Sequence, residues 1–151
     1  MPILRTPQPQ LAAALSDLCL RSKAVWGYDA AFLEACRPAL TLTAEDWKVS
    51  DLQIAVDSER ILGLAQVRSH GQIAELDKLF IEPDARAAGI GRSLFDWCVE
   101  AAINRGATVM TIDADPGAAD FYRHMGAVDD AVIASTVIPG RFLPRLKLEL
   151  R

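Results

Sequence analysis

Residues that build disulfide frameworks and metal centres are scarce in this sequence. It has three cysteines and two histidines. Cys19, Cys36 and Cys98 are an odd number without C-x-x-C spacing, and His70 and His124 stand far apart. We therefore expect neither a disulfide framework nor a zinc site.

An excess of positive charge and a long apolar run are absent as well. The 16 lysines and arginines are outnumbered by 20 acidic residues, which gives a formal charge of −4 and a pI near 5.1. This balance gives no electrostatic reason to expect nucleic acid as a partner. The sequence has no run of about 18 apolar residues to span a membrane and no apolar N-terminal signal segment. We expect a cytoplasmic protein with no nucleic-acid or membrane partner.

What the sequence does contain is ordinary globular composition, with 51% hydrophobic and 24% charged residues among 151. This length predicts one domain over residues 1–151. Apolar spacing predicts helices at Gln10–Arg21, from the N-cap Asp29 to Arg37, at Gly89–Arg105 and at Pro116–Met125. Strands are predicted at Gln53–Val56, Ile61–Val67, Ile73–Ile81, Thr108–Ile112, Val128–Val137 and Arg141–Leu150.

The order of these elements predicts the topology. Residues 73–112 read as strand, helix, strand, which implies a right-handed crossover between parallel strands. The other strands follow one another through short turns and should pair antiparallel. We expect a mixed α/β (α+β) fold with helices on both faces of the sheet. Thr41–Thr43 alternates like a strand, Pro38 should end the second helix, and Pro144 predicts an edge position or a bulge in the last strand.

The most informative stretch is residues 79–94, where an apolar strand ends and, after a short loop, a helical pattern begins. Gly89 and Gly91 let the backbone approach a ligand with no Cβ in the way. The helix that begins there directs unpaired N–H groups and a partial positive charge at the loop. With Arg86 and Arg92 on either side, the stretch predicts a site for a phosphate or pyrophosphate.

Two general phosphate-binding motifs compete for this loop and fit it poorly. A P-loop needs G-x-x-x-x-G-K-[ST], and the lysine and the hydroxyl are missing. A dinucleotide fingerprint, G-x-G-x-x-G, is met by Gly89 and Gly91, but Leu94 takes the third position. Asp113 lies about where the ribose-binding acid belongs. The residues after Ile112 predict a short helix and a hairpin in place of a second β-α-β unit, so a nicotinamide-dinucleotide binder is the weakest alternative.

A family resemblance fits better. Arg86-Ala87-Ala88-Gly89-Ile90-Gly91 resembles the R/Q-x-x-G-x-G/A pyrophosphate loop of the GNAT superfamily of N-acetyltransferases. Residues 115–127 resemble its second motif, N-x-x-A-x-x-F/L-Y-x-x-x-G-F, with Asp115 in place of asparagine and Ala127 in place of the aromatic residue. The two motifs come in the usual order and at the usual separation, and the likeness is close over residues 73–128.

The resemblance implies that acetyl-CoA and an amine meet in a ternary complex, beside a mostly antiparallel sheet whose parallel strand pair splays open. The residues it implies for coenzyme A binding are Leu79, Phe80, Ile81, Arg86, Ala87, Ala88, Gly89, Ile90, Gly91, Arg92, Ser93, Asp115 and Tyr122. Tyr122 is also implied as the acid that protonates the departing thiolate. The base is open between Asp113 at a strand end, Glu75 on the preceding strand, with Asp77 on the same face as Glu75, and water.

The acceptor is expected to be a primary amine on a small molecule or a peptide. Trp26, Tyr28 and Phe32 lie where the superfamily closes its acceptor pocket, and they either contact the acceptor or pack in the core. The leading hypothesis is an acetyl-CoA-dependent N-acetyltransferase. The alternative is a catalytically idle member that binds an acyl-CoA as a sensor or structural ligand, and a homodimer is left open.

Overall fold

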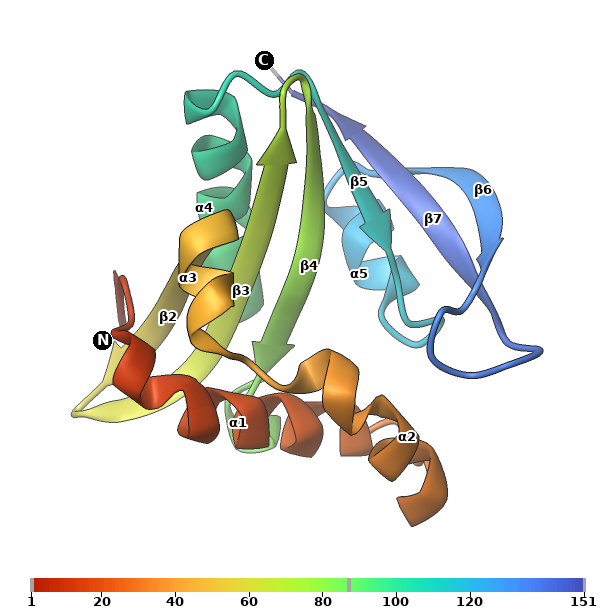
Figure 1. The fold of residues 1–151 in the computed structure, drawn as a ribbon. Helices are drawn as coiled ribbons and strands as arrows, with labels where there is room; N and C mark the ends of the chain where they lie inside the picture. The colour runs from red at the N-terminus through yellow and green to blue at the C-terminus, as the bar shows by residue number, and fades with distance from the viewer. Residues whose placement is uncertain (1, 87, 151) are drawn as a thin grey trace.

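The computed structural model describes residues 2–86 and 88–150 (Figure 1). The elements in chain order are β1 (Ile3–Arg5), α1 (Ala12–Ala24), α2 (Ala30–Leu40), α3 (Ala44–Val49), β2 (Asp51–Asp57), β3 (Arg60–His70), β4 (Ile73–Ile81), α4 (Ile90–Asn104), β5 (Val109–Asp113), α5 (Ala119–His124), β6 (Val128–Ala134) and β7 (Phe142–Glu149). Short 3-10 turns at Pro9–Leu11 and Pro83–Ala85 precede α1 and follow β4. In the described part of the chain, no helix is long and apolar enough to cross a membrane.

The strands form one seven-stranded sheet in the order β1-β2-β3-β4-β5-β7-β6. Among the described strands, β4 and β5 pair in parallel and every other neighbouring pair is antiparallel. The mixed, mostly antiparallel sheet and the parallel pairing of β4 with β5 across α4 are therefore confirmed. The prediction that no second β-α-β unit follows was wrong, because β5 and β6 run parallel on either side of β7 and α5 connects them.

Helices cover both faces of the sheet, as expected, because each face buries its own apolar cluster (Figure 1). α1 and α2 place Leu15, Cys19 and Cys36 against β2 and β3 on one face. α4 and α5 cover the other face, where Phe95 and Cys98 are buried to 1% exposure or less. Burial raises the pKa of the Cys98 thiol, so this residue is part of the core and no nucleophile.

Two predictions about the N-terminal third were wrong. Thr43 does not continue a strand but caps α3, where its hydroxyl and the Asp46 carboxylate form a reciprocal capping box. α2 also runs past Pro38 to Leu40. Pro38 removes one helical hydrogen bond, but Cys36 and Leu40 lie four residues apart on one buried face and hold the last turn in place.

The predicted edge position of Pro144 was also wrong, since β7 lies between β5 and β6. The pairing with β5 ends one residue away, at Asp113 opposite Arg145. The missing N–H of Pro144 therefore interrupts no ladder with β5, and its carbonyl accepts from the N–H of Ala114 at 3.0 Å. The irregularity in this hairpin falls on β6, near Asp129.

Candidate active site

β4 and β5 separate in the middle of the sheet. Ile73–Glu75 pair with Val109–Thr111, and the ladder between the two strands stops there. The strands beyond this point line a cavity of about 460 Å³, which α1, α5 and the β6–β7 loop also line. The splaying of the parallel strand pair, which the family resemblance implied, is confirmed.

The open side of β4 presents backbone groups to this cavity. The N–H of Glu82 donates to a carbonyl of β3 at 2.8 Å. Backbone direction alternates along a strand, so Phe80 also faces β3, whereas Leu79 and Ile81 direct their N–H and C=O groups toward the opening. The N–H of Ile81 donates to the hydroxyl of Ser22 at 3.3 Å. Of the three strand residues implied for cofactor binding, Leu79 and Ile81 have the orientation that backbone contacts require.

The predicted pyrophosphate loop lies at the start of α4. Gly89 has a φ of 76°, a left-handed conformation that favours glycine, and no described atom lies within 4 Å of the place a Cβ would take. Ile90 turns into the core at 3% exposure, while Gly91 lines the cavity. The first N–H groups of the 15-residue helix α4 have no partner within the helix. Ala87, which the sequence also places in this loop, lies outside the described residues.

The other loop residues lie at the surface. Ala88, Arg92 and Ser93 are exposed, and the hydroxyl of Ser93 donates to the carbonyl of Gly89 at 3.2 Å. The structure leaves all of them accessible to a ligand at the start of α4.

Arg86 and Trp26 join this loop to α1. The guanidinium carbon of Arg86 lies 4.5 Å from the ring centroid of Trp26, a cation–π contact, and both residues line the cavity. The indole also packs on Gly117, where a Cβ would come within 2.8 Å of the ring. Trp26 therefore contacts both the cofactor loop and the turn before α5.

Tyr122 projects from α5 into the same cavity and is 6% exposed. Its ring packs with Phe95 and Phe121 at centroid distances of 6.0 and 5.3 Å. Burial raises the pKa of this phenol, and no hydrogen bond from a described residue contributes to the shift. Tyr122 thus keeps its proton and has the hydroxyl available for a ligand.

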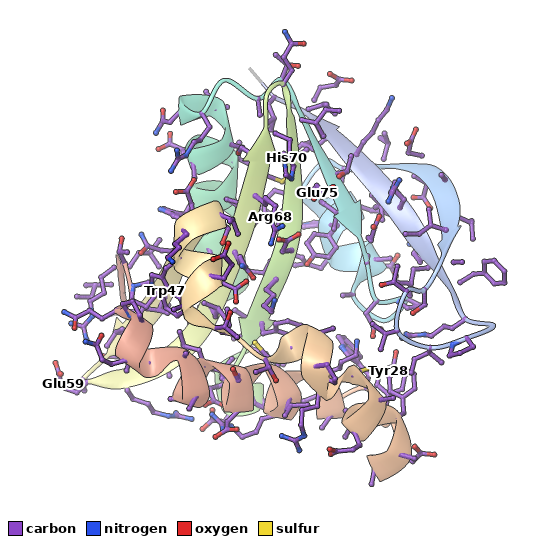
Figure 2. The ribbon with its side chains drawn as sticks, viewed as in Figure 1. Tyr28, Trp47, Glu59, Arg68, His70 and Glu75 are labelled. Carbon is purple, nitrogen blue, oxygen red and sulfur yellow. The ribbon has the colours of Figure 1, made fainter. Side chains whose placement is uncertain are left out.

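The two acids named as candidate bases have different surroundings. Asp113 lines the cavity, but its carboxylate accepts two hydrogen bonds from Arg145, at 2.6 and 3.0 Å. Glu75 lies on the paired part of β4, half-exposed and 3.6 Å from His70, and the cavity lining does not include it (Figure 2). The structure brings Asp113 to the cavity and leaves Glu75 away from it.

Asp77, two residues after Glu75 on β4, lies at the cavity. It is the extra residue of a bulge in β4, since Leu76 pairs with Val67 whereas Lys78 pairs with Gln66. Its side chain lines the cavity, and burial raises the pKa of its carboxyl while nearby cations oppose the shift. The closest of these cations is Arg68, whose Nε lies 3.4 Å from a carboxylate oxygen of Asp77.

Asp115 holds together the wall formed by α1 and the β6–β7 loop. One carboxylate oxygen accepts from the Tyr28 hydroxyl at 2.7 Å and from Lys23 at 3.1 Å, and the other accepts from the N–H of Gly117 at 3.0 Å. Burial works to raise the pKa of Asp115, but these hydrogen bonds and the charge of Lys23 outweigh it and hold the pKa below its usual value. Asp115 is thus an ionised structural anchor beside the cavity.

Tyr28 and Phe32 pack against the residues of this wall without lining the cavity. Their rings stack at 4.0 Å, and the cavity lining includes Trp26 but neither of these two. Burial and the bond to Asp115 raise the pKa of Tyr28 to about 12. Of the three aromatic residues predicted near the acceptor, Trp26 alone is placed against the cavity in the described structure.

The sequence matches the model of a known domain over residues 19–131, described as an acetyltransferase (GNAT) domain. The chain belongs to the GNAT family. A curated relative, an uncharacterized N-acetyltransferase from Methanocaldococcus jannaschii, is 31% identical over 65 residues, which are 41% of this chain and 29% of that protein. The match thus spans less than a third of the relative's length.

Solved GNAT structures share the fold over nearly the whole chain. A GCN5-related N-acetyltransferase from Rhodopseudomonas palustris superposes with a TM-score of 0.80 at 23% identity, covering 99% of this chain and 96% of its own. The paia N-acetyltransferase from Thermoplasma acidophilum, solved in complex with coenzyme A, gives 0.79 at 11% identity and covers 99% of each chain. The yncA protein from Salmonella typhimurium, solved with its cofactor acetyl-CoA, gives 0.70 at 18% identity, covering 100% of this chain and 95% of its own.

Two features of this GNAT site were not found from the sequence. Lys23 and Arg141 line the cavity and surround Asp115, although 92 and 26 residues separate them from it along the chain. The bulge at Asp77 was also missed, although the consecutive charged residues Asp77 and Lys78 interrupt the alternation of the strand and were a signal for it.

Proposed function

We propose that this protein is an acetyl-CoA-dependent N-acetyltransferase that transfers the acetyl group to a primary amine by direct attack in a ternary complex. The observation that carries the proposal is the cavity between β4 and β5. Backbone groups of Leu79 and Ile81 that lie outside the ladder with β3, the start of α4 and the buried phenol of Tyr122 all border this one space. Acetyl-CoA, when bound there, supplies a thioester carbonyl for the amine to attack.

The residues of the cavity suit the parts of this cofactor. The start of α4, with Gly89 and Gly91 lacking side chains, offers N–H groups and positive potential for a pyrophosphate. Arg86 adds a positive charge at the same place. Leu79 and Ile81 offer strand-like hydrogen bonds of the kind that the amides of a pantetheine arm accept and donate.

Two side chains would handle the protons. Tyr122 keeps its proton because its pKa is raised, and in our proposal its hydroxyl donates that proton to the departing thiolate. We assign Asp77 as the base, since it lines the cavity and burial makes its carboxyl a better proton acceptor. Asp113 is a weaker candidate because Arg145 occupies its carboxylate.

The proposal is tested by incubating the protein with acetyl-CoA and a panel of neutral, cationic and carboxylated primary amines while measuring release of free thiol. The expected result is amine-dependent release of coenzyme A and a stoichiometric N-acetylated product detected by mass spectrometry. Binding of acetyl-CoA without product from any amine would contradict acetyl transfer and indicate a binding protein.

A further inference from the structure

Two cations and one carboxylate meet where α1 and the β6–β7 loop close over the cavity. The Lys23 ammonium lies 3.1 Å from the Asp115 carboxylate, and the Arg141 guanidinium lies 3.4 Å from the same oxygen. The three side chains are only 13, 18 and 12% exposed, in the order Lys23, Arg141, Asp115, and all line the cavity. The cluster therefore carries one positive charge in excess in a place that is poorly hydrated.

The hydrogen-bonding capacity of the two cations is not used up. Within the described chain, one nitrogen of Arg141 donates hydrogen bonds: Nη2 donates to the Tyr28 hydroxyl at 2.6 Å and to the Asp115 carboxylate at 3.4 Å. Its Nε and Nη1 donors are left, as are two of the three N–H groups of Lys23. The free nitrogens of Arg141 are not among the fully buried, unpartnered polar atoms of the described residues, so they are accessible to a ligand in the cavity. An anion there would complete the cluster and balance its excess charge.

We propose that the amine acceptor carries a carboxylate, which binds to Arg141 and Lys23. This inference rests on the proposed acetyltransferase function. A guanidinium presents parallel N–H groups that match a carboxylate, and a neighbouring ammonium adds charge without restricting geometry. The same excess charge repels a polycationic acceptor.

The position of the cluster assigns it to the acceptor and not to the cofactor. Lys23 comes from α1 and Arg141 from the β6–β7 loop, whereas the predicted pyrophosphate site has its own charge in Arg86 and the start of α4. Apart from Thr136, the remaining lining contributed by α2 and the β6–β7 hairpin is apolar: Ala39, Leu40, Val137 and Leu143. The acceptor class that fits is a primary amine with one carboxylate and an apolar body.

Matched acceptors test this inference. Free amino acids with apolar side chains are compared with their methyl esters, with aminoalkylphosphonates of similar length and with simple alkylamines. We expect kcat/KM for the free carboxylates to exceed that for the esters by roughly 10- to 100-fold, the range of a charge-assisted hydrogen bond. Arg141→Gln and Lys23→Gln should each remove most of this preference, and Arg141→Lys should retain part of it.

Binding is measured beside turnover by titrating the same free amino acids and esters calorimetrically into the protein saturated with coenzyme A. Free amino acids should bind more tightly than esters, and Arg141→Gln should abolish the difference while acetyl-CoA affinity stays constant. The control is Arg105→Gln, which removes an arginine paired with Asp51 at the far end of α4 and should change neither quantity. Melting temperatures confirm that each variant is folded.

Several results would overturn the inference. Equal use and binding of acids and esters would show that the acceptor needs no anion, with the acetyltransferase function intact. A loss of acetyl-CoA affinity in both Arg141→Gln and Lys23→Gln would assign the cluster to the cofactor. A preference for phosphonates over carboxylates would replace the carboxylate by a phosphate group. If no amine of any class releases thiol, the proposed function fails, and calorimetry alone decides whether the cluster binds a carboxylate.

Discussion

Replacing Gly91 by valine should abolish cofactor binding while leaving the fold intact. Gly91 lies in the first turn of α4 and lines the cavity at the predicted pyrophosphate site. A Cβ at this position would meet Phe121 at 3.5 Å, an ordinary van der Waals distance. Valine is also a better helix former than glycine by a few tenths of a kcal/mol. The variant should therefore melt within a few degrees of the parent protein in the absence of ligand.

The size of the thermal shift that Gly91→Val should lose follows from mass action. A ligand present at 100 times its Kd stabilises the folded state by about 2.7 kcal/mol. For a chain of this length, 1 kcal/mol corresponds to about 2–4 °C, so acetyl-CoA should raise the Tm of the parent by roughly 5–11 °C. The Gly91→Val variant should show no such shift, because the added methyl groups occupy space that the ligand needs.

Two further variants complete the thermal-shift assay. Asn104→Val places the same side chain on the exposed C-terminal end of α4 and should keep the full shift. Gly91→Ala adds a Cβ alone, so it separates ligand exclusion from any strain that the valine γ-methyls cause against Phe121. A parent-like shift in Gly91→Val would refute our placement of the pyrophosphate.

Three other variants test the wall of the cavity. Asp77→Asn should lower kcat by about 10²–10⁴-fold and remove the acidic limb of the pH–rate profile. The folded-state pKa of Asp77 is raised, so the parent protein loses stability as pH rises through that pKa, and the variant should not show this loss. Asp115→Asn should lower the unfolding free energy by about 1–3 kcal/mol at neutral pH. Because the pKa of Asp115 is lowered, its contribution to stability is present above about pH 4 and lost on acidification, so the unfolding free energies of parent and variant should converge in an acid-denaturation series. Gly117→Ala should displace Trp26, seen as a change in tryptophan fluorescence, and weaken acetyl-CoA binding by roughly 2- to 5-fold through loss of the contact with Arg86.

Local signals in the sequence were enough to predict much of this fold. The strand Ile73–Ile81 was predicted with its observed bounds, because Gly71 and Pro83 mark both ends. The helix after Gly89 was predicted within a residue at either end for a similar reason, since Gly106 stands just beyond it with a φ of 93°.

Features that depend on tertiary contacts could not be predicted in this way. α3 has six residues, too few for a helical period to show, although Thr43 and Asp46 carried a capping pattern. The bulge at Asp77 depends on strand register, and the cluster around Asp115 joins three distant segments. The sequence therefore located the cofactor loop better than the base or the acceptor wall.

The turnover of Tyr122→Phe tests the central claim most directly. The substitution keeps the ring and its packing against Phe95 and Phe121 but removes the one hydroxyl proton. With the best acceptor from the amine panel, kcat for thiol release should fall by about 10²–10⁴-fold, the usual contribution of a general acid. Acetyl-CoA affinity and Tm should stay close to those of the parent. Parent-like turnover, or a lowered Tm with unchanged turnover per folded molecule, would contradict the assignment of Tyr122 as the acid of an acetyl transfer.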